Sequence, residues 1–542
     1  MKYIKSIILL IITLSVLLNC ARRGTPTGGP KDEDAPITIK TVPQFKSVNF
    51  NKNEIRIYFD EYVKLEDVKK NLIISPPLKY PANITPLGIP SKKIVIKLKD
   101  TLIANTTYTF NFGESIVDNN EGNVLKSFNY VFSTGNYIDS LAISGSISDS
   151  FSKESDKYVS ILLYEANDQF NDSTIYKEKP LYVTNTLDSL AWNIDNLKAG
   201  KYHLLALKSD RNDYLFNPKS DKIAYLDTII SVPTEKQFKL KLFKEIIAFK
   251  PFKATEVSKG HIVFPYEGIG CDFKVALDSV KSNLKTIISK SFLEKDKDTL
   301  NYYYKTDNEI DSLFFNLTST NYSSTEKITL RSKEIDSIII TANLRGNMTF
   351  RDTLTLQINN PLDQFNKELF SVFDKDTVAV NFKLKRKNHT ELQVLFNAKE
   401  NQNYKVKILP NAITDFFNQT NKDTIKYSLK TKEKDNYGSI SFDFKNTNNE
   451  SIIIQLLSKK EEIIATKYLN TDAAINFELL KPSVYLIRII FDKNSNHIWD
   501  TGNYYNKNQP EKVVYFNTDI EVKENWFFKE NINLDSYRNN ID

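Results

Sequence analysis

Short runs of alternating apolar and polar residues recur along most of this 542-residue chain. Four of them lie near the start, at residues 55–59, 94–98, 108–112 and 128–132, and clusters of Asn, Asp, Gly and Pro separate them. An apolar residue at every second position is typical of a strand with one buried face, and regular spacing with turn residues is typical of β-sandwiches. The pattern therefore predicts an all-β chain with few helices.

The first twenty residues depart from this alternation. Two lysines precede a mostly apolar run without charges, residues 7–18, which is too short to span ~30 Å of hydrocarbon comfortably. We therefore expect a signal peptide at residues 1–19. The segment ends in Leu-Leu-Asn-Cys20, which resembles the lipobox of bacterial lipoproteins, and the resemblance implies that the thiol of Cys20 is acylated. The alternative is an uncleaved anchor with an incidental cysteine.

Residues 20–36 combine Gly, Pro, Thr and charge without apolar periodicity, so we expect a lipidated, flexible linker. The acidic stretch 32–34 is similar to the tags that send some Bacteroidota lipoproteins to the cell surface. These features predict a protein anchored to outer-membrane lipid through Cys20 and exposed at the cell surface. With Cys20 acylated, Cys271 has no partner within the chain, so folding must proceed without disulfides.

Comparison of the chain with itself reveals a first repeat. TYTFNFGESIVDNNEGN, from Thr107, matches NYKVKILPNAITDFFNQTN, from Asn403, and each is followed by another strand. Self-similarity at this distance indicates duplicated domains. Both segments resemble the S-layer type of bacterial Ig-like domain, at residues 37–135 and 346–435. The resemblance implies a sandwich that serves as a spacer or adhesive module and has no activity of its own.

A second repeat follows each copy of the first. The segment from Leu197 matches the segment from Leu480, with Tyr202 aligned to Tyr485 and Tyr225 aligned to Tyr515. Both resemble the transthyretin-like sandwich of carboxypeptidase-regulatory domains. We therefore expect an all-β tandem array of Ig-like and transthyretin-like sandwiches after the lipoprotein signal peptide. The expected order is Ig-like (37–135), transthyretin-like (136–245), a middle sandwich (246–345), Ig-like (346–435) and transthyretin-like (436–542).

Composition agrees with a folded, multidomain protein. Hydrophobic residues make up 41% and charged residues 26%, which are globular proportions. At ~100–150 residues per domain, the length suggests roughly four or five domains. The 73 basic residues exceed the 67 acidic ones only slightly and form no block, which argues against nucleic acid as a partner.

One loop combines several oxygen-bearing side chains at regular spacing. Asp492, Asn494, Asn496 and Asp500 occupy positions one, three, five and nine, which is the spacing that EF-hand and dockerin loops use for calcium. His497 replaces the usual Gly at position six, and an Asn replaces the usual acid at position twelve. The two interpretations are a structural calcium site and a set of Asx turns that satisfy their own backbone. We expect no other cofactor.

The residues that usually carry catalysis do not form a recognisable pattern. His203, His261, His389 and His497 lack zinc-ligand spacing, and no G-x-S-x-G nucleophile elbow occurs. We therefore predict that the chain is not an enzyme and has no catalytic residues. A hydrolase that uses scattered carboxylates is the alternative, and it would need a deep cleft with two facing acids.

A tripeptide of Asp, then Ser or Thr, then an aliphatic residue is overabundant. It resembles the acceptor for O-glycosylation of exported Bacteroidota proteins, and the resemblance implies glycosylation at Thr101, Ser140, Ser189 and Thr228 among others. The alternative is a turn Asp that leads into a strand.

Together these features predict a non-catalytic outer-membrane lipoprotein that acts as a structural or interaction subunit. Its partners would be envelope proteins, as in an accessory subunit of an outer-membrane assembly or secretion complex. The rival hypothesis is a surface glycan-binding or adhesive protein, in which rings such as Tyr302, Tyr303 and Tyr304 could stack on sugars.

Overall fold

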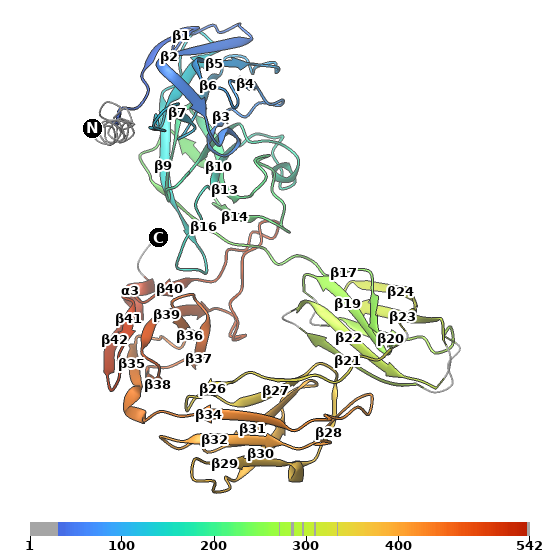
Figure 1. The fold of residues 1–542 in the computed structure, drawn as a ribbon. Helices are drawn as coiled ribbons and strands as arrows, with labels where there is room; N and C mark the ends of the chain where they lie inside the picture. The colour runs from blue at the N-terminus through green and yellow to red at the C-terminus, as the bar shows by residue number, and fades with distance from the viewer. Residues whose placement is uncertain are drawn as a thin grey trace, which may run out of the picture.

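The computed structural model describes residues 31–269, 272–282, 287–294, 297–307, 310–332 and 334–538 (Figure 1). These residues form strands in five successive β-sandwiches, which confirms the predicted all-β tandem array. Cys20 and Cys271 lie outside the described residues. The helices of the described part are short: α2 (Val68–Asn71), α3 (Leu534–Arg538) and the 3-10 turns η1 (Thr174–Tyr176), η3 (Lys367–Leu369) and η4 (Lys434–Asn436).

The first sandwich buries an aromatic-rich core between two sheets. Phe110 and Phe132 are fully buried because alternate residues of their strands face the opposite sheet. One sheet has the order β1-β2-β5-β4 with β7 beside β2, and the other has the order β3-β6-β8. The strands are β1 (Thr38–Val42), β2 (Glu54–Leu65), β3 (Ile73–Ser75), β4 (Asn83–Thr85), β5 (Ser91–Lys97), β6 (Thr107–Asn111), β7 (Ile116–Asp118) and β8 (Asn129–Ser133).

The second sandwich has one sheet that is buried on both faces. Leu204 of β13 packs in the inner core, whereas its neighbour Leu205 packs in a second cluster on the outer face. The sheet orders are β11-β10-β13-β14, with β15 beside β13, and β12-β9-β16. The strands are β9 (Leu141–Asp149), β10 (Ser160–Glu165), β11 (Tyr182–Asn185), β12 (Ala191–Leu197), β13 (Gly200–Lys208), β14 (Lys222–Tyr225), β15 (Ile230–Val232) and β16 (Phe238–Leu242).

The third sandwich is built around Phe264, Tyr302 and Phe315. Its sheets have the orders β17-β19-β22-β21, with β18 beside β19, and β20-β23-β24. The strands are β17 (Lys250–Pro251), β18 (Thr255–Ser258), β19 (His261–Glu267), β20 (Lys274–Leu277), β21 (Ile288–Glu294), β22 (Thr299–Lys305), β23 (Ser312–Ser319) and β24 (Tyr322–Thr329).

The fourth sandwich packs two four-stranded sheets around an aliphatic core. Their orders are β25-β27-β31-β30 and β26-β34-β32-β29, and β28 pairs separately with β33. The strands are β25 (Ile340–Ala342), β26 (Gly346–Asn347), β27 (Leu354–Ile358), β28 (Leu362–Phe365), β29 (Phe370–Phe373), β30 (Phe382–Arg386), β31 (Glu391–Phe396), β32 (Asn403–Ile408), β33 (Ile413–Asp415) and β34 (Ile425–Lys430).

The fifth sandwich repeats the topology of the second. Its sheets have the orders β37-β36-β39-β40, with β41 beside β39, and β38-β35-β42. Tyr515 lies opposite Arg488 in the sheet, just as Tyr225 lies opposite Leu205 in the second sandwich. The strands are β35 (Gly438–Lys445), β36 (Ser451–Ser458), β37 (Ile463–Leu469), β38 (Ala473–Leu480), β39 (Ser483–Asp492), β40 (Val513–Tyr515), β41 (Ile520–Val522) and β42 (Phe527–Asn533).

Tyrosines in the repeated motifs close loops onto their own strands. The hydroxyl of Tyr108 accepts the N–H of Ile103 at 2.8 Å, and the hydroxyl of Tyr404 accepts the N–H of Lys399 at 2.6 Å. In the other repeat, Tyr202 and Tyr485 each donate to a backbone carbonyl four residues upstream. These are corner bonds of the kind that immunoglobulin sandwiches use, so the repeated tyrosines have a structural role.

Aspartates of the first repeat also have a structural role. The carboxylate of Asp118, 1% exposed, accepts backbone N–H groups from four residues of the following turn, at 2.6–3.2 Å. Its counterpart Asp415 is fully buried and accepts from Phe417, Gln419 and Asn360. Burial alone would raise the pKa of Asp118, but the backbone donors outweigh it and lower that pKa.

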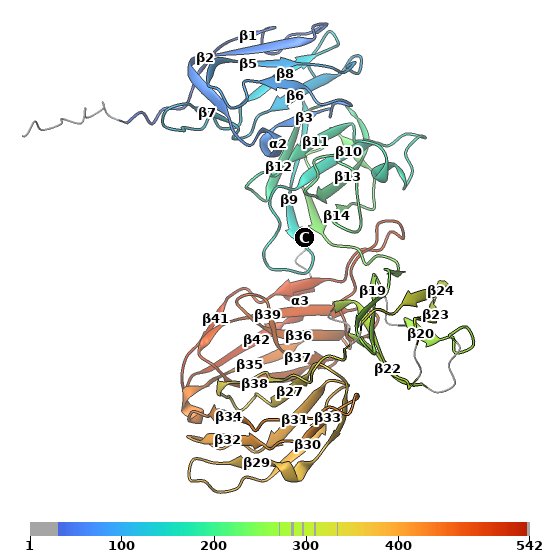
Figure 2. The same ribbon diagram turned by 45° about the vertical axis from the view of Figure 1, so that its right-hand side comes forward.

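The five sandwiches fold back on themselves rather than forming a rod. The first sandwich lies at one end of the molecule and the fourth at the other, and the fifth returns to lie beside the second (Figures 1 and 2). Residues more than 250 positions apart in the sequence are therefore in contact, as the bonds between Thr501 and Lys244 and between Tyr515 and Phe151 illustrate.

Candidate functional site

The second and fifth sandwiches are in contact through residues that lie more than 250 positions apart in the sequence. The connection from β39 to β40, residues 493–512, extends away from its own sandwich and lies on the outer face of the second one. Tyr504 from this connection is only 3% exposed and belongs to the outer cluster of the second sandwich. Its ring meets that of Tyr225 edge to face, with centroids 5.2 Å apart. We call residues 499–511 the clasp.

Polar groups fix the position of the clasp. The hydroxyl of Thr501 donates to the carbonyl of Lys244 at 2.8 Å, and the N–H of Tyr504 donates to the carboxylate of Glu245. Burial raises the pKa of that carboxyl group, and the hydrogen bond from Tyr504 opposes the effect. At Gly502, a Cβ atom would lie 2.7 Å from the ring of Phe243, so any larger residue would push the clasp away. The clasp is therefore fitted to this surface.

A buried arginine forms the second part of the contact. The side chain of Arg488 in β39 is 2% exposed and donates to Glu461 at 2.8 Å, Gln455 at 3.0 Å and Tyr515 at 2.8 Å. The ring of Phe151, from the β9–β10 loop of the second sandwich, covers the guanidinium at 3.9 Å. A buried charge is tolerated only when it is paired and hydrogen-bonded. Phe151 can therefore exclude water from Arg488 only because the guanidinium already bonds to its neighbours in the fifth sandwich.

Sequence reasoning missed this contact, although three signals were present. The apolar runs of β13 and β39 are continuous rather than alternating, which is typical of a sheet covered on both faces. Arg488 interrupts the second run, and a glycine precedes Asn-Tyr-Tyr in a long connection. None of these signals identifies which surface covers each sheet, because the covering residues lie about 260–340 positions away in the sequence.

The predicted calcium loop, residues 492–500, overlaps the start of the clasp, and its side chains bond to one another. Asp492 is almost fully buried and accepts the N–H groups of Asn496 and His497 at 3.1 and 3.0 Å. The amide nitrogens of Asn494 and Asn496 donate to Asp500 at 2.6 and 2.9 Å. The N–H groups of Asn496 and Ile498 donate to the side-chain oxygens of Asn494 and Asn496 at 3.1 and 2.9 Å, which are the bonds that the Asx-turn interpretation expects. Within the described residues, no group of three or more His, Cys, Asp or Glu is arranged to hold a metal.

The corresponding loop of the second sandwich carries its own cation. Arg211 pairs with Asp213 at 3.2 Å and with buried Asp221 at 2.9 Å. In the fifth sandwich, Glu511 accepts from the backbone of Lys493 and Asp500 instead. Burial raises the pKa of Glu511, and the backbone donors oppose this, while the nearby carboxylates Asp500 and Asp492 raise it further. Among the described residues, no lysine or arginine forms an ion pair with these three carboxylates.

Calcium binding at Asp492, Asn494, Asn496 and Asp500 stays a prediction, with a direct test. If Ca²⁺ binds this loop, adding it to chelator-treated protein should raise the melting temperature and slow amide exchange in residues 492–500. Asp500→Asn should abolish the shift, whereas Asp210→Asn, in the loop of the second sandwich, should retain it. Identical melting curves with chelator and with Ca²⁺ would leave only the Asx-turn interpretation.

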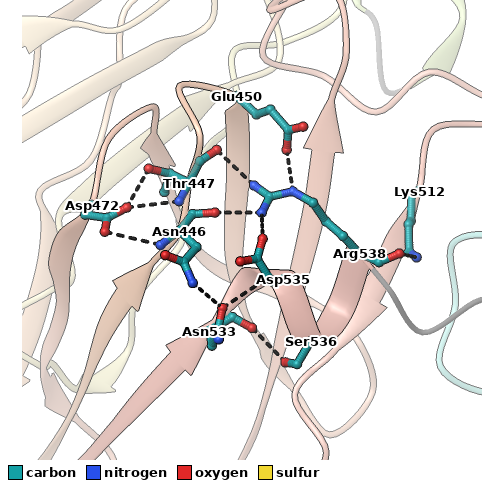
Figure 3. Close-up of polar contacts among 9 residues, drawn as sticks. All are labelled: Asn446, Thr447, Glu450, Asp472, Lys512, Asn533, Asp535, Ser536 and Arg538. Carbon is teal, nitrogen blue, oxygen red and sulfur yellow. Dashed lines mark hydrogen bonds and ion pairs between the residues drawn. The ribbon is translucent and has the colours of Figure 1, made fainter.

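A cluster of hydrogen bonds around Arg538, at the C-terminal end of the described chain, holds α3 against the fifth sandwich. Arg538 of α3 donates to Glu450 at 2.9 Å and to Asp535 at 2.6 Å, and its remaining donors reach the carbonyls of Asn446 and Thr447 (Figure 3). Asp472 accepts from Thr447 in the same network. Because the guanidinium donors already have protein acceptors, the cluster is a structural clamp between α3 and the β35–β36 turn.

The candidate glycosylation sites are accessible. Thr101, Ser140, Ser189 and Thr228 are all exposed, as a modified hydroxyl must be. The preceding aspartates differ, because Asp139 is buried against Thr107 whereas Asp188 pairs with Lys157 at the surface. Glycosylation therefore stays a prediction that the geometry permits.

The three consecutive tyrosines of β22 are packing residues. Tyr302, Tyr303 and Tyr304 are 4%, 3% and 5% exposed, so none offers a free face to a sugar. Tyr303 lies in a stack of rings with His261 and Phe292, and Phe292 stacks on His389 of the fourth sandwich with centroids 4.6 Å apart. This stack joins the third and fourth sandwiches.

Comparison with known proteins supports the Ig-like interpretation of the first sandwich. Residues 32–134 match the family model of the bacterial Ig-like domain. No curated protein matches the chain. Among the described residues, no helix has the length and apolar character that a membrane span requires.

Several solved β-sandwich structures are similar at low TM-scores. Domains MG0-NIE-MG1 of alpha-2-macroglobulin from Escherichia coli are 13% identical, with a TM-score of 0.17, over 32% of this chain and 71% of that one. Domains 1–6 of the surface layer protein SbsC are 10% identical, with a TM-score of 0.17, over 90% and 67%. The BSP domain of a biofilm associated protein is 9% identical, with a TM-score of 0.14, over 86% and 97%.

Proposed function

We propose that this chain is a non-catalytic, lipid-anchored protein of the outer membrane that acts as a structural or interaction subunit at the cell surface. Acylated Cys20 would attach it to the lipid, and the sandwiches would present binding surfaces to other envelope proteins. An accessory role in an outer-membrane assembly or secretion complex fits this proposal. The bacterial Ig-like domain at residues 32–134 supports it, because such domains serve as modules rather than as enzymes.

The observation that carries the proposal is the docking of the fifth sandwich onto the second. Spacer domains that are joined only by flexible linkers need no such contact, because their relative positions can vary. Here the clasp buries Tyr504, and Phe151 covers Arg488, so the two halves of the chain have a defined relative position. A surface composed of several domains is thereby preformed, which lowers the entropic cost of binding a large partner.

The test is purification of the intact chain, tagged at its C-terminus, from envelopes in mild detergent. Mass spectrometry should find an acylated N-terminal cysteine and a stoichiometric envelope protein in the same complex. A variant that carries Cys20→Ala behind a cleavable signal peptide of the non-lipoprotein type should leave the membrane fraction and lose its partner. Recovery of a lone or unacylated wild-type chain would contradict the proposal.

A further inference from the structure

The largest run of exposed apolar side chains lies where the described chain begins. Within twelve residues, five large apolar side chains are 41–64% exposed: Ile37, Ile39, Val42, Phe45 and Val48. Soluble surfaces usually expose such side chains singly, and a contiguous group marks an interaction site. We call residues 37–52 the N-terminal rim.

The rim follows one edge of the first sandwich. It begins with the edge strand β1, which pairs only with β2 in its sheet. The chain then crosses to the edge of the other sheet, where the N–H of Lys46 donates to the carbonyl of Val131 and the N–H of Phe50 donates to that of Ser133. Phe45 and Phe128 line a groove along this edge. Of the five apolar side chains, Ile39 and Phe45 thus line the same groove.

The charge of the rim is of one sign. Lys40, Lys46 and Lys52 lie among the apolar residues, and residues 37–53 contain no acid. The ammonium groups of Lys40 and Lys46 lie 4.9 and 5.5 Å from the ring centroids of Tyr58 and Phe45. Asp60, which accepts the N–H of Ile37, is a nearby acid at the start of the rim. Apolar side chains interspersed with lysines are the composition of a surface that enters the headgroup region of an anionic bilayer.

We propose that the N-terminal rim rests on the anionic lipid leaflet to which Cys20 is anchored. This inference rests on the lipid anchor of the proposed function. Sixteen residues separate Cys20 from Ile37, so the rim begins at most about 60 Å from the acylated cysteine even when that segment is fully extended. Such tethering raises the local concentration of lipid, and a weak interfacial affinity then suffices for contact.

Addition of a partner strand to β1 fits the observations less well. The pairing of β1 with β2 has an irregularity between Thr38 and Lys40, and Lys40 lies within the strand. Bulges and lysines are the features by which proteins protect edge strands from pairing with other chains. The bulge and Lys40 therefore disfavour pairing of β1 with another strand, whereas the apolar side chains of the rim remain exposed. This combination fits a contact with lipid better than the addition of a strand.

The test uses the acylated full-length chain in vesicles of phosphatidylcholine and phosphatidylglycerol whose acyl chains carry bromine, which quenches tryptophan. A Phe45→Trp variant adds one tryptophan to the wild-type chain. In the brominated vesicles, the emission of this added tryptophan should fall by roughly twofold. A Val280→Trp variant, which places the probe at an 88% exposed position in the third sandwich, should not. Adding Lys40→Glu and Lys46→Glu to the Phe45→Trp variant should remove most of the quenching.

Flotation of the vesicles separates the two possible failures. If the chain does not float with vesicles, the anchor fails and the rim proposal fails with it. If the chain floats with the vesicles but the tryptophan of the Phe45→Trp variant is not quenched, the anchor is retained and the proposed contact between the rim and lipid is wrong. Shielding of the tryptophan in this variant only after outer-membrane proteins are added would also overturn it, in favour of a protein partner.

Discussion

Replacing Tyr504 with alanine is expected to undock the fifth sandwich from the second. The ring of Tyr504 is 3% exposed and fills the outer cluster of a sandwich about 260–340 residues away in sequence. Truncation of a buried aromatic residue typically costs about 3–5 kcal/mol, and an anchoring ring at the centre of a contact costs a similar amount. Hydrogen exchange should therefore accelerate in β13, β14 and the clasp, and small-angle scattering should report a larger molecule.

The adjacent residue provides a matched control. Tyr505 is 69% exposed, so Tyr505→Ala removes the same side chain from the same loop and should change docking by less than about 0.5 kcal/mol. Gly502→Val should act like Tyr504→Ala, because a Cβ atom there would collide with Phe243. Equal protection in the Tyr504→Ala and Tyr505→Ala proteins would show that the clasp contributes little to the docked state.

Replacing Asp118 with alanine is expected to destabilise the first sandwich by about 2–3 kcal/mol. Four backbone N–H groups would lose their acceptor, and a buried donor without a partner costs more than the hydrogen bond itself contributed. The measurement is the opening free energy of β6 and β8 from hydrogen exchange in the intact chain. Glu121→Ala removes an exposed acid from the same turn and should have little effect.

The contribution of Asp118 should also depend on pH in a defined direction. Its pKa is lowered in the folded protein, so its stabilisation is complete above the unfolded pKa of about 3.9 and is lost as the pH falls through the folded pKa. The wild-type and Asp118→Ala proteins should therefore differ fully near neutral pH and converge under strongly acidic conditions. A difference that stays constant down to the lowest pH would assign the effect to packing instead.

The repeats show how far local sequence determines this fold. Tyr108 and Tyr404 can be aligned by eye, and each makes its corner bond to a residue five positions upstream. Asp118 and Asp415 likewise bond to the turns that directly follow them. Such contacts depend on spacing within one segment, which is why the alternating pattern and the duplicated motifs predicted an all-β array.

Only part of the candidate site could be predicted from the amino-acid sequence. The Asp492 loop was identified because its oxygens are regularly spaced, but the spacing alone left two interpretations open. The bonds from Asn494 and Asn496 to Asp500 depend on how the loop closes in three dimensions. Tyr302, Tyr303 and Tyr304 could be assigned to a strand, whereas their burial depends on the neighbouring sheet and on the fourth sandwich.

By itself, the amino-acid sequence determined the class of the described segments, which are strands whose period of two follows from the β-backbone, and it predicts a signal peptide before Cys20. The tertiary structure alone decided that the chain folds back, that Tyr504 and Phe151 join its two halves, and that the apolar rim after residue 36 stays uncovered. The physical reason is the distance along the sequence between the residues that interact. Periodicity and turns report on neighbours a few residues apart, whereas the burial of Arg488 depends on a surface more than three hundred residues away in the sequence.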